Sequence, residues 1–318
     1  MCTSILMNGK KAIFGRNMDL HYPLEMNVVI TPRKYPFSFR KAGIIEDHYA
    51  MIGMAMVRKN YPLYFEAANE CGLAVAGLNF PDNAYYTPHF SDEKSNISPF
   101  ELIPWLLSSC KTVDEAEILL QKTHICGIDF SKEMPLSPLH WHIADKERSI
   151  VFEVTENGQK IYENPINVMT NNPPFDFHLQ NIALYLNLDN NNRENVFSEK
   201  GIKPFSGGFG AIGLPGDFSS TSRFVKAAFL LSNLHENNLS DFFHILDSVA
   251  MVRGGIKVSG EDDVTLYSSG IDLENLVYYY KTIKNNRICA VKMNGAVLDS
   301  FELYSFNADE EQDISYKN

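Results

Sequence analysis

Long apolar segments are missing from this 318-residue sequence: no run reaches about 18 residues, so no membrane-spanning helix is predicted. The first residues lack a basic segment followed by an apolar run and a small-residue cleavage site, the pattern of a secretory signal. Dense lysine and arginine blocks are absent too, and the net charge is −11, which disfavours nucleic acids and anionic membranes as partners. We therefore expect a cytoplasmic protein that binds neither nucleic acid nor membrane.

Cysteine is scarce in the sequence. There are 5 cysteines, an odd number, and no CxxC pair. This pattern argues against a disulfide framework and a thiolate metal site, and it suits a reducing cytoplasm. Four of the cysteines are interpreted as small buried hydrophobic residues: Cys71, Cys110, Cys126 and Cys289. Cys2 is set apart by its position directly after the initiator methionine.

Several common catalytic signatures are also missing, because the sequence has no GxSxG, HExxH or P-loop motif. The segment 208–213 matches GxGxxG, but Pro215 and Gly216 follow where a dinucleotide site needs a helix. We interpret the segment as a glycine-rich loop. His140 and His142 could lie on one face of a strand, yet no carboxylate or cysteine at suitable spacing completes a metal site. We expect neither a metal nor an organic cofactor.

The first recognisable element is a β-hairpin near the N-terminus. Asn8-Gly9 stands between two largely apolar runs, a strong short signal for a two-residue type I′ turn. The pairs expected to face each other are Met7 with Lys10, Ile5 with Ala12, and Cys2 with Gly15. In this register Arg16 lies beside Cys2, and Asp19 is a few residues beyond. One turn would therefore gather a thiol, a guanidinium and a carboxylate.

Short, often alternating apolar runs predict antiparallel rather than parallel sheet. Strands are expected at 50–57, 73–78, 140–144, 150–155, 160–162, 264–267, 276–282 and 287–292. Helices are expected from Ser98 to Cys110 and from Thr112 to Lys122, both opened by capping boxes, from Ser222 to Leu231, and from an N-cap at Ser240. Strands, then helices, then strands without strict alternation indicate an α+β fold of packed layers. No linker divides the chain, so residues 2–318 are expected to form one domain.

Cys2 has a chemical reason to act as a nucleophile. An initiator methionine is generally removed when the next residue is small, and removal would give Cys2 both a thiol and a free α-amine. The reference pKa of an α-amine, about 8, is close to that of a free thiol, about 8.5. The amine can therefore act as general base for the thiol of its own residue, without a histidine. A guanidinium at Arg16 would favour the thiolate.

Six sequence blocks occur in the order in which a known family has them. They are residues 1–4 (MCTS), 14–19 (FGRNMD), 76–81 (AGLNFP), 139–141 (LHW), 170–173 (TNNP), and 213–217 with 222–224 (GLPGD and SRF). In these blocks the chain resembles the choloylglycine hydrolase family, which contains conjugated bile salt hydrolases and penicillin V acylases. The resemblance implies the N-terminal-nucleophile (Ntn) hydrolase fold, a four-layer αββα sandwich of two antiparallel sheets flanked by helices. It also implies a homotetramer.

The resemblance assigns catalytic roles residue by residue. The implied residues are Cys2 as nucleophile and base, Arg16 and Asp19 as the pair that orders the thiolate and the α-amine, Asn171 and Asn79 at the two oxyanion positions, and Arg223 beside the nucleophile. The implied reaction is acyl transfer, in which the thiolate attacks an amide carbonyl and water hydrolyses the resulting thioester. Without the resemblance, such an arginine–aspartate pair is usually a surface salt bridge, and asparagines are usually turn formers.

The residue at position 79 bears on the substrate. In this family asparagine at the position of Asn79 is typical of bile salt hydrolases, and tyrosine is typical of penicillin V acylases. The favoured substrate is therefore a glycine- or taurine-conjugated bile salt. By the same matching, the apolar substrate pocket is formed by Met18, Phe65, Phe130, Met134 and Leu139, for each of which core packing is the alternative. We hypothesise that Arg58 and Lys59 attract the anionic end of the substrate; a solvated turn is the simpler interpretation.

Other functions stay open at this point. A penicillin V acylase, or an acylase of other N-acyl compounds such as acyl homoserine lactones, would use the same residues on another amide. A binding protein with this fold but without catalysis is the alternative from another class. It is disfavoured because every catalytic-type position is filled. A nucleotide-dependent oxidoreductase would rest only on the glycine-rich loop.

Overall fold

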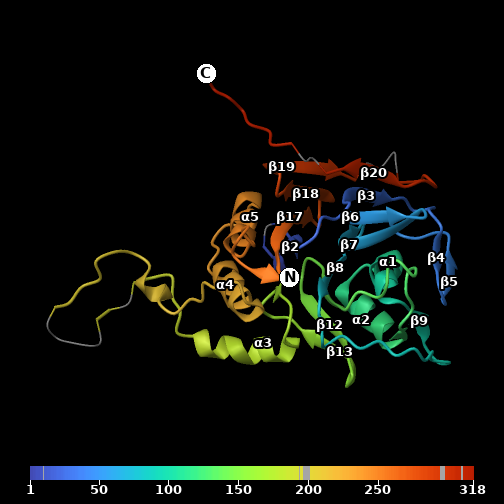
Figure 1. The fold of residues 1–318 in the computed structure, drawn as a ribbon, viewed down its shortest axis with the longest axis horizontal. Helices are drawn as coiled ribbons and strands as arrows, with labels where there is room; N and C mark the ends of the chain where they lie inside the picture. Colours follow the sequence, from blue (N-terminus) through green and yellow to red (C-terminus); the bar gives the residue numbers. More distant parts are fainter. Residues whose placement is uncertain (10, 193, 196–200, 294–297, 309–310) are drawn as a thin grey trace.

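Two antiparallel sheets stacked face to face form the centre of the protein (Figure 1). The structure, a computed structural model, describes residues 1–9, 11–192, 194–195, 201–293, 298–308 and 311–318. Among these residues, the first sheet has six strands in the order β14 (Val168–Met169), β1 (Cys2–Met7), β2 (Ile13–Leu20), β17 (Val264–Asp272), β18 (Val277–Thr282) and β19 (Asn285–Lys292). The second has eight, in the order β13 (Gly158–Glu163), β12 (Ser149–Thr155), β11 (Leu139–Ala144), β8 (Ala74–Asn79), β7 (Tyr61–Asn69), β6 (Met51–Arg58), β3 (Asn27–Thr31) and β20 (Tyr304–Asn307).

Helices cover the outer face of each sheet, which completes the expected αββα layers. The eight-stranded sheet is covered by α1 (Leu102–Ser109) and α2 (Val113–Gln121), and the six-stranded sheet by α4 (Ser220–Ser232) and α5 (Leu239–Ser248). Beside α4 lies α3 (Phe175–Asn181), which continues into the turn η2 (Ile182–Tyr185). The remaining short elements are β4 (Phe37–Phe39), β5 (Gly43–Ile45), β9 (Ser95–Ile97), β10 (Thr123–Ile125), β15 (Lys257–Val258), β16 (Glu261–Asp262), η1 (Pro99–Glu101) and η3 (Phe209–Ala211).

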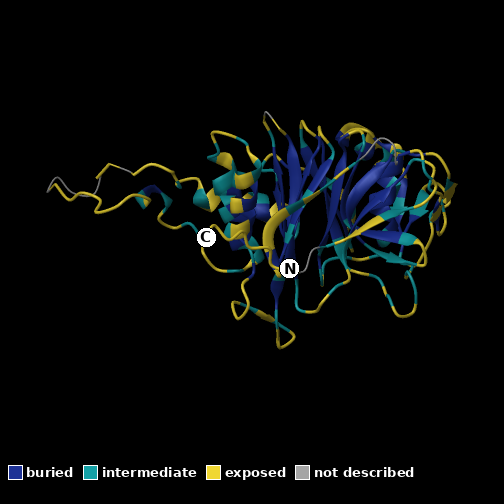
Figure 2. Cartoon of the chain, turned by 90° about the horizontal axis from the view of Figure 1, so that it is seen from above, coloured by how far each residue is buried: buried dark blue, intermediate teal, exposed yellow. Residues whose placement is uncertain are grey.

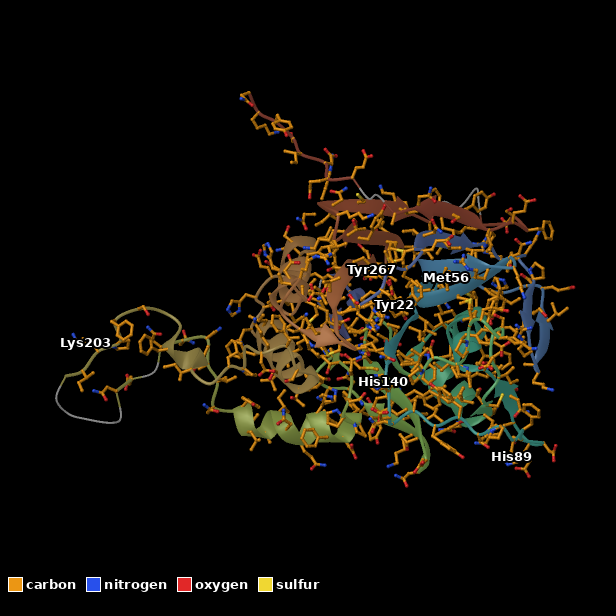
Figure 3. All side chains as sticks on the ribbon, in the orientation of Figure 1. Tyr22, Met56, His89, His140, Lys203 and Tyr267 are labelled. Carbon is orange, nitrogen blue, oxygen red and sulfur yellow. The ribbon has the colours of Figure 1, made fainter. Side chains whose placement is uncertain are left out.

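An arm extends from the body between η2 and α4. Figure 3 shows Lys203 far from the layered core, at the outer part of this arm. The described residues of the predicted loop 189–195 lie on the arm and are mostly exposed. The glycine-rich segment 208–213 lies there as well and forms a loop with the single turn η3. This segment is therefore a loop, as the sequence indicates.

Two apolar cores hold the layers together. Figure 2 shows the buried positions concentrated in the two sheets, with exposed positions on the outer sides of the helices. Along β3, Val28 and Ile30 face the core between the sheets, whereas Val29 faces the core beneath α1 and α2. Every residue of β1 is buried, because the second sheet covers one face and α4 the other. Cys2, the first residue of β1, therefore lies in the interior of the sandwich.

The N-terminal hairpin is present, but its predicted register is wrong by three residues. The observed partners are Met7 with Ile13, Ile5 with Gly15, and Cys2 with Met18. The connection spans residues 8–12 instead of two residues; Lys10, which the prediction used, lies outside the described residues. The carbonyl of Asn8 accepts a hydrogen bond from Asn237, and Gly9 has φ 145°, which is not type I′ geometry. Because both strands are buried on both faces, their apolar pattern does not specify a register.

The predicted strands and helices each overlap an observed one, with shifted boundaries. The backbone N–H of Ser98 donates to Glu101 at 2.8 Å, as a capping box requires, but the first turn is the 3₁₀ turn η1. The N-cap predicted at Ser240 is wrong: the side chain of Asn238 caps α5 by accepting from Asp241. None of the helices in the described part of the chain is long and apolar enough to cross a membrane.

Candidate active site

Cys2 lies at the start of β1 and is only 3% exposed. It pairs with Met18 of β2, and Arg16, two residues away on β2, projects from the same face of the sheet. Nη2 of Arg16 donates a hydrogen bond to Sγ of Cys2. The thiol and the guanidinium do meet, although the reach of the arginine side chain brings them together rather than the predicted register.

Arg16 is enclosed between the two sheets. Its Nη1 donates to the carbonyl of Gly77 in β8 at 2.6 Å, and its Nε lies 3.8 Å from Oε2 of Glu66 in β7. Burial acts to lower the pKa of Arg16, but interactions with Cys2, Tyr267 and Glu66 outweigh it, so the pKa is raised above its ordinary value. The guanidinium is therefore a fixed positive charge at the sulfur.

A second buried arginine approaches Cys2 from α4. Nη1 of Arg223 donates to the carbonyl of Cys2 and to Oγ1 of Thr3, both at 2.6 Å, and Nη2 donates to Oδ1 of Asn171 at 2.9 Å. Burial lowers the pKa of Arg223, while Asp19 and Cys2 act in the opposite direction. These bonds fix the main chain at Cys2 and the side-chain amide of Asn171.

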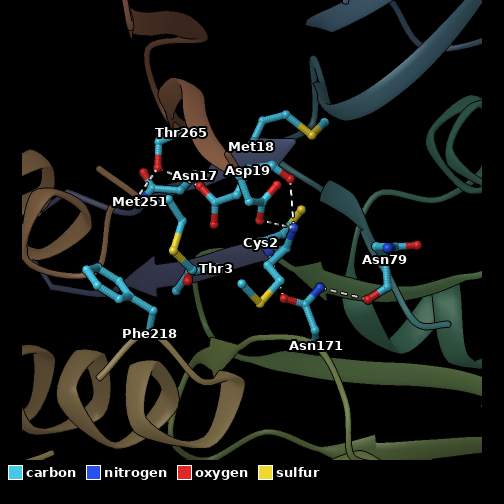
Figure 4. A network of polar contacts seen from close by, with 12 residues as sticks. Cys2, Thr3, Asn17, Met18, Asp19, Asn79, Asn171, Phe218, Met251 and Thr265 are labelled. Atoms are coloured by element: carbon cyan, nitrogen blue, oxygen red, sulfur yellow. Dashed lines mark hydrogen bonds and ion pairs between the residues drawn. The ribbon is translucent and has the colours of Figure 1, made fainter. Parts of the chain in front are cut away.

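Asn171 follows β14 and connects Cys2 to Asn79 (Figure 4). Its Oδ1 accepts from the backbone N–H of Cys2, and its Nδ2 donates to the carbonyl of Asn79, both at 2.7 Å. Nε2 of His178 in α3 is hydrogen-bonded to the carbonyl of Asn171 at 3.0 Å. In Figure 4 the side-chain amide of Asn79 extends away from Cys2. The contact of Asn79 with this network is therefore made by its backbone.

The amino terminus lies in an acidic surrounding. The terminal amine of Met1 donates to the carbonyl of Asp19 at 2.8 Å and to Oδ2 of Asp263 at 3.1 Å. Oδ1 of Asp19 accepts from Thr265 at 2.6 Å, whereas its Oδ2 is buried without a hydrogen-bond partner among the described residues. Burial raises the pKa of Asp19, although Arg223 and the terminal amine act to lower it. One carboxylate oxygen beside the start of the chain can thus accept a further donor.

Four of the five predicted pocket residues line one cavity of about 150 Å³: Phe65, Phe130, Met134 and Leu139. Gly77 also lines this cavity, and its carbonyl accepts from Arg16, so the cavity adjoins the guanidinium. Met18 is not among the lining residues; its Sδ lies 3.6 Å from Nη2 of Arg16. A larger hollow of about 520 Å³ lies between η2 and α4, and Cys2 does not line it.

The two basic residues considered for substrate attraction lie on the β6–β7 turn. Arg58 forms an ion pair with the exposed Glu25 at 2.8 Å. Lys59 and Asn60, with φ 51° and 59°, form the two-residue loop of the hairpin. The charge of Arg58 is therefore compensated locally, which favours the simpler interpretation of a solvated turn.

The histidines of β11 have partners other than a metal. His140 is hydrogen-bonded to Glu153 at 3.0 Å and to the carbonyl of Thr170 at 2.9 Å. His142 is hydrogen-bonded to Oγ of Ser4 at 2.9 Å. Over the described ranges, no group of three or more histidine, cysteine or acidic side chains is arranged to hold a metal ion. The interpretation of these two residues as hydrogen-bonded strand histidines is confirmed.

Several residues of this region were not found from the sequence. They are Glu66, Asp263, Thr265, Tyr267, Ser269 and Tyr278, all within two hydrogen bonds or ion pairs of Met1 or Arg16. One signal was available for Glu66, which stands inside the apolar run of β7, where a charged residue must be paired if it is buried. Asp263 offered no such signal, because it ends an acidic run that reads as exposed loop.

Comparison with known proteins agrees with this geometry. The profile of the linear amide C–N hydrolases, choloylglycine hydrolase family, matches residues 2–306. A bile salt hydrolase/transferase of Lactiplantibacillus plantarum is 47% identical over 313 residues, covering 96% of both chains. A crystal structure of a mutant conjugated bile acid hydrolase from Clostridium perfringens is 34% identical, with TM-score 0.94 and 100% coverage of both chains. Penicillin V acylase from Agrobacterium tumefaciens, 20% identical with TM-score 0.75 over 96% of this chain and 90% of its own, shares the fold. The chain therefore belongs to the choloylglycine hydrolase family and is a hydrolase of linear amide C–N bonds.

Proposed function

We propose that the chain hydrolyses the amide bond of glycine- or taurine-conjugated bile salts, with Cys2 as the nucleophile after removal of Met1. The observation that carries the proposal is the setting of Cys2, with a guanidinium at its sulfur and an asparagine oxygen at its nitrogen. The names of the similar proteins from Lactiplantibacillus plantarum and Clostridium perfringens support bile salts as the substrate.

Removal of Met1 prepares the nucleophile. The nitrogen of Cys2 becomes an α-amine that faces Oδ1 of Asn171, and the unpartnered Oδ2 of Asp19 is a buried acceptor near the chain start. The neutral amine takes the thiol proton as general base. Arg16 then balances the thiolate, and the carboxylate of Asp19 stabilises the ammonium.

Acylation transfers the acyl group to sulfur. The thiolate forms a C–S bond with the amide carbonyl, and the carbonyl electron pair moves onto oxygen. Nδ2 of Asn171 uses one hydrogen on the carbonyl of Asn79, and its second hydrogen is available to the oxyanion. The ammonium of Cys2 gives its proton to the leaving nitrogen, the C–N bond breaks, and glycine or taurine departs. A thioester remains on Cys2.

Deacylation uses the same groups in reverse. The α-amine takes a proton from water, the resulting hydroxide attacks the thioester carbonyl, and Arg16 receives the thiolate as it leaves. An amine that entered in place of water would complete an acyl transfer. This second outcome agrees with the name hydrolase/transferase carried by the Lactiplantibacillus plantarum protein.

The apolar cavity beside Arg16 supports a steroid as the acyl group. Its lining by Phe65, Phe130, Met134 and Leu139 offers the apolar surface that a steroid requires, beside the guanidinium that contacts the sulfur. We propose bile salts rather than penicillin V as the substrate, because the relatives at 47% and 34% identity are named for bile salts or bile acids. The penicillin V acylase compared above is only 20% identical, and its likeness concerns the fold alone.

The test combines an intact mass with an assay of released amine. Purified protein is incubated with glycine conjugates, with taurine conjugates and with penicillin V, and a chain that has lost Met1 is expected to release glycine or taurine. Activity on penicillin V alone would move the assignment to an acylase of that type. No activity on any amide, from a chain that begins at Cys2, would contradict the proposal and favour a binding role.

Maturation and assembly are part of the proposal. We propose that residues 2–318 act as one domain and that the chain forms a homotetramer, which rests on the family resemblance. Size-exclusion chromatography with light scattering should give about four times the 36.0 kDa chain mass. A monomer that retains full activity would contradict this assembly.

A further inference from the structure

Glu66 is a buried carboxylate between the two sheets that the reaction described above does not use. It projects from β7 toward the six-stranded sheet and is 0% exposed. Its Oε2 accepts from the hydroxyl of Tyr267 at 2.7 Å, and its Oε1 accepts from Ser269 at 3.0 Å and from Tyr278. Figure 3 shows Tyr267 inside the body of the protein, on β17. Three hydroxyl donors directed at one carboxyl group match its ionised form, which accepts only.

The positive charge nearest to Glu66 is Arg16. Oε2 of Glu66 lies 3.8 Å from Nε of Arg16, and both side chains are without solvent exposure. On its other side the same guanidinium donates to Sγ of Cys2. Arg16 thus stands between two groups that can carry a negative charge, a carboxylate on β7 and a thiolate on β1. Asp19 is the other carboxylate whose charge reaches Arg16.

The charge at sulfur is not constant during the reaction. The thiolate becomes a neutral thioester on acylation and returns on deacylation. A buried guanidinium without a counter-charge is costly, because an unpaired charge loses its hydration without compensation. If Cys2 were its sole partner, acylation would leave the charge of Arg16 buried between the sheets without a counter-charge.

We propose that Glu66 is the permanent counter-ion of Arg16, a positioning residue that keeps the guanidinium neutralised at the sulfur while Cys2 passes between thiolate and thioester. The hydroxyls of Tyr267, Ser269 and Tyr278 hold the carboxylate ionised and in place. Burial raises the pKa of Glu66, and Arg16 followed by the two tyrosines opposes this. The inference rests on Cys2 being the nucleophile of the proposed function.

Neutralising Glu66 while keeping its shape gives the first test. In Glu66→Gln the thiolate is the remaining anion in contact with Arg16, so the pH midpoint for alkylation of Cys2 by iodoacetamide should fall, by about one unit. A thiolate held this tightly is a weaker nucleophile, so kcat should fall at least tenfold with KM changed less than threefold. Glu101→Gln is the matched control, because Glu101 is buried and hydrogen-bonded to backbone N–H groups away from Cys2. Its alkylation midpoint should stay in place.

Melting temperatures give a second test that does not depend on turnover. Glu66→Gln should lower Tm, and Arg16→Met combined with Glu66→Gln should recover most of the loss, because neither charge is then left buried alone. The Tm of Cys2→Ala combined with Glu66→Gln should fall by more than the sum of the decreases in the two single variants, because Arg16 then loses both groups that can carry a negative charge beside it. If Glu66→Gln fails to fold, the Arg16→Met double variant still decides, since a soluble double variant supports the counter-ion.

Other outcomes would overturn the inference. An alkylation midpoint that is unchanged or higher in Glu66→Gln would mean that Glu66 does not balance Arg16 against the thiolate. A double variant with Arg16→Met that is no more stable than Glu66→Gln would mean that the carboxylate serves packing alone. Both readouts can be obtained even if no conjugated bile salt is hydrolysed, so they are separable from the test of the substrate.

Discussion

The two buried arginines that flank Cys2 have opposite electrostatic settings. Arg16 lies between a thiol and a carboxylate, and its pKa is raised. Arg223 donates to neutral oxygens, those of Cys2, Thr3 and Asn171, and burial lowers its pKa. Both are fully enclosed, so the difference comes from their partners rather than from exposure.

This difference assigns separate tasks to the two residues. A guanidinium in contact with sulfur stabilises whichever charge appears there, so Arg16 acts on the nucleophile. A guanidinium bound to a carbonyl and an amide oxygen orients those groups, so Arg223 acts on the geometry of Cys2 and Asn171. The predictions below test this division.

The largest effect is expected at Cys2, which both arginines contact. Cys2→Ala should lower the release of glycine or taurine at least a thousandfold, because no other group supplies the nucleophile. Binding of the conjugate, followed by calorimetry, should persist, since the apolar cavity is unchanged. Residual turnover above about 1% of the wild-type rate would mean that Cys2 is not the nucleophile, and the two arginines would then have no shared reacting group to act on.

The two arginines should separate when each is replaced by methionine. Arg16→Met should lower kcat by about two orders of magnitude and slow the alkylation of Cys2 at neutral pH, because the thiolate loses its counter-charge. Arg223→Met should lower kcat less and leave the alkylation rate near that of the wild type. The measurement is the pH dependence of iodoacetamide inactivation beside steady-state kinetics. Equal effects on alkylation would contradict the division of tasks.

Much of this arrangement could be predicted from the sequence, but the strand register that produces it could not. The layered α+β fold and the meeting of Cys2 with Arg16 were predicted, the latter from a hairpin register that is wrong by three residues. The error arose because strands buried on both faces carry no alternation that fixes a register. The contact survives because an arginine side chain is long enough to reach along the strand.

The contacts of Cys2 and Arg16 with residues far away in the sequence could not be predicted from local sequence patterns. Asn171 and Arg223 came from the family resemblance, since each lies more than 150 positions from Cys2 and no local pattern joins them. Glu66, a buried carboxylate paired across two sheets, was overlooked. Such pairings depend on how two sheets stack, and strand periodicity gives only which face a side chain occupies.

Asn171, which accepts a hydrogen bond from Arg223, is expected to give the next largest loss of activity. Asn171→Ala should lower kcat by about a hundredfold with little change in KM, since a donor to the oxyanion acts mainly in the transition state. Asn79→Ala is the matched control, because Asn79 contacts Asn171 through its backbone carbonyl, and it should lower kcat less than tenfold. A larger loss at Asn79 than at Asn171 would reverse the roles given to the two residues.

Acid should act on the network around Arg223 and Asn171 through a buried histidine. His178 is bonded to Asn171, and its pKa is lowered to about 4, mainly by burial. Above the ordinary histidine pKa of about 6.5 the group is neutral in both states, so it has no effect on stability. As pH falls toward 4 the unfolded chain binds the proton first, and stability is lost.

The smallest effect is therefore expected from His178→Gln. Between pH 7 and pH 5 the unfolding free energy of this variant should fall by about 2 kcal/mol less than that of the wild type, since the variant lacks the histidine that the unfolded chain protonates. Urea denaturation at both pH values measures the difference, with the exposed His235→Gln as the control. An equal acid sensitivity of wild type and His178→Gln would show that His178 is not the neutral partner of Asn171. The acid sensitivity of the fold would then have to come from other groups.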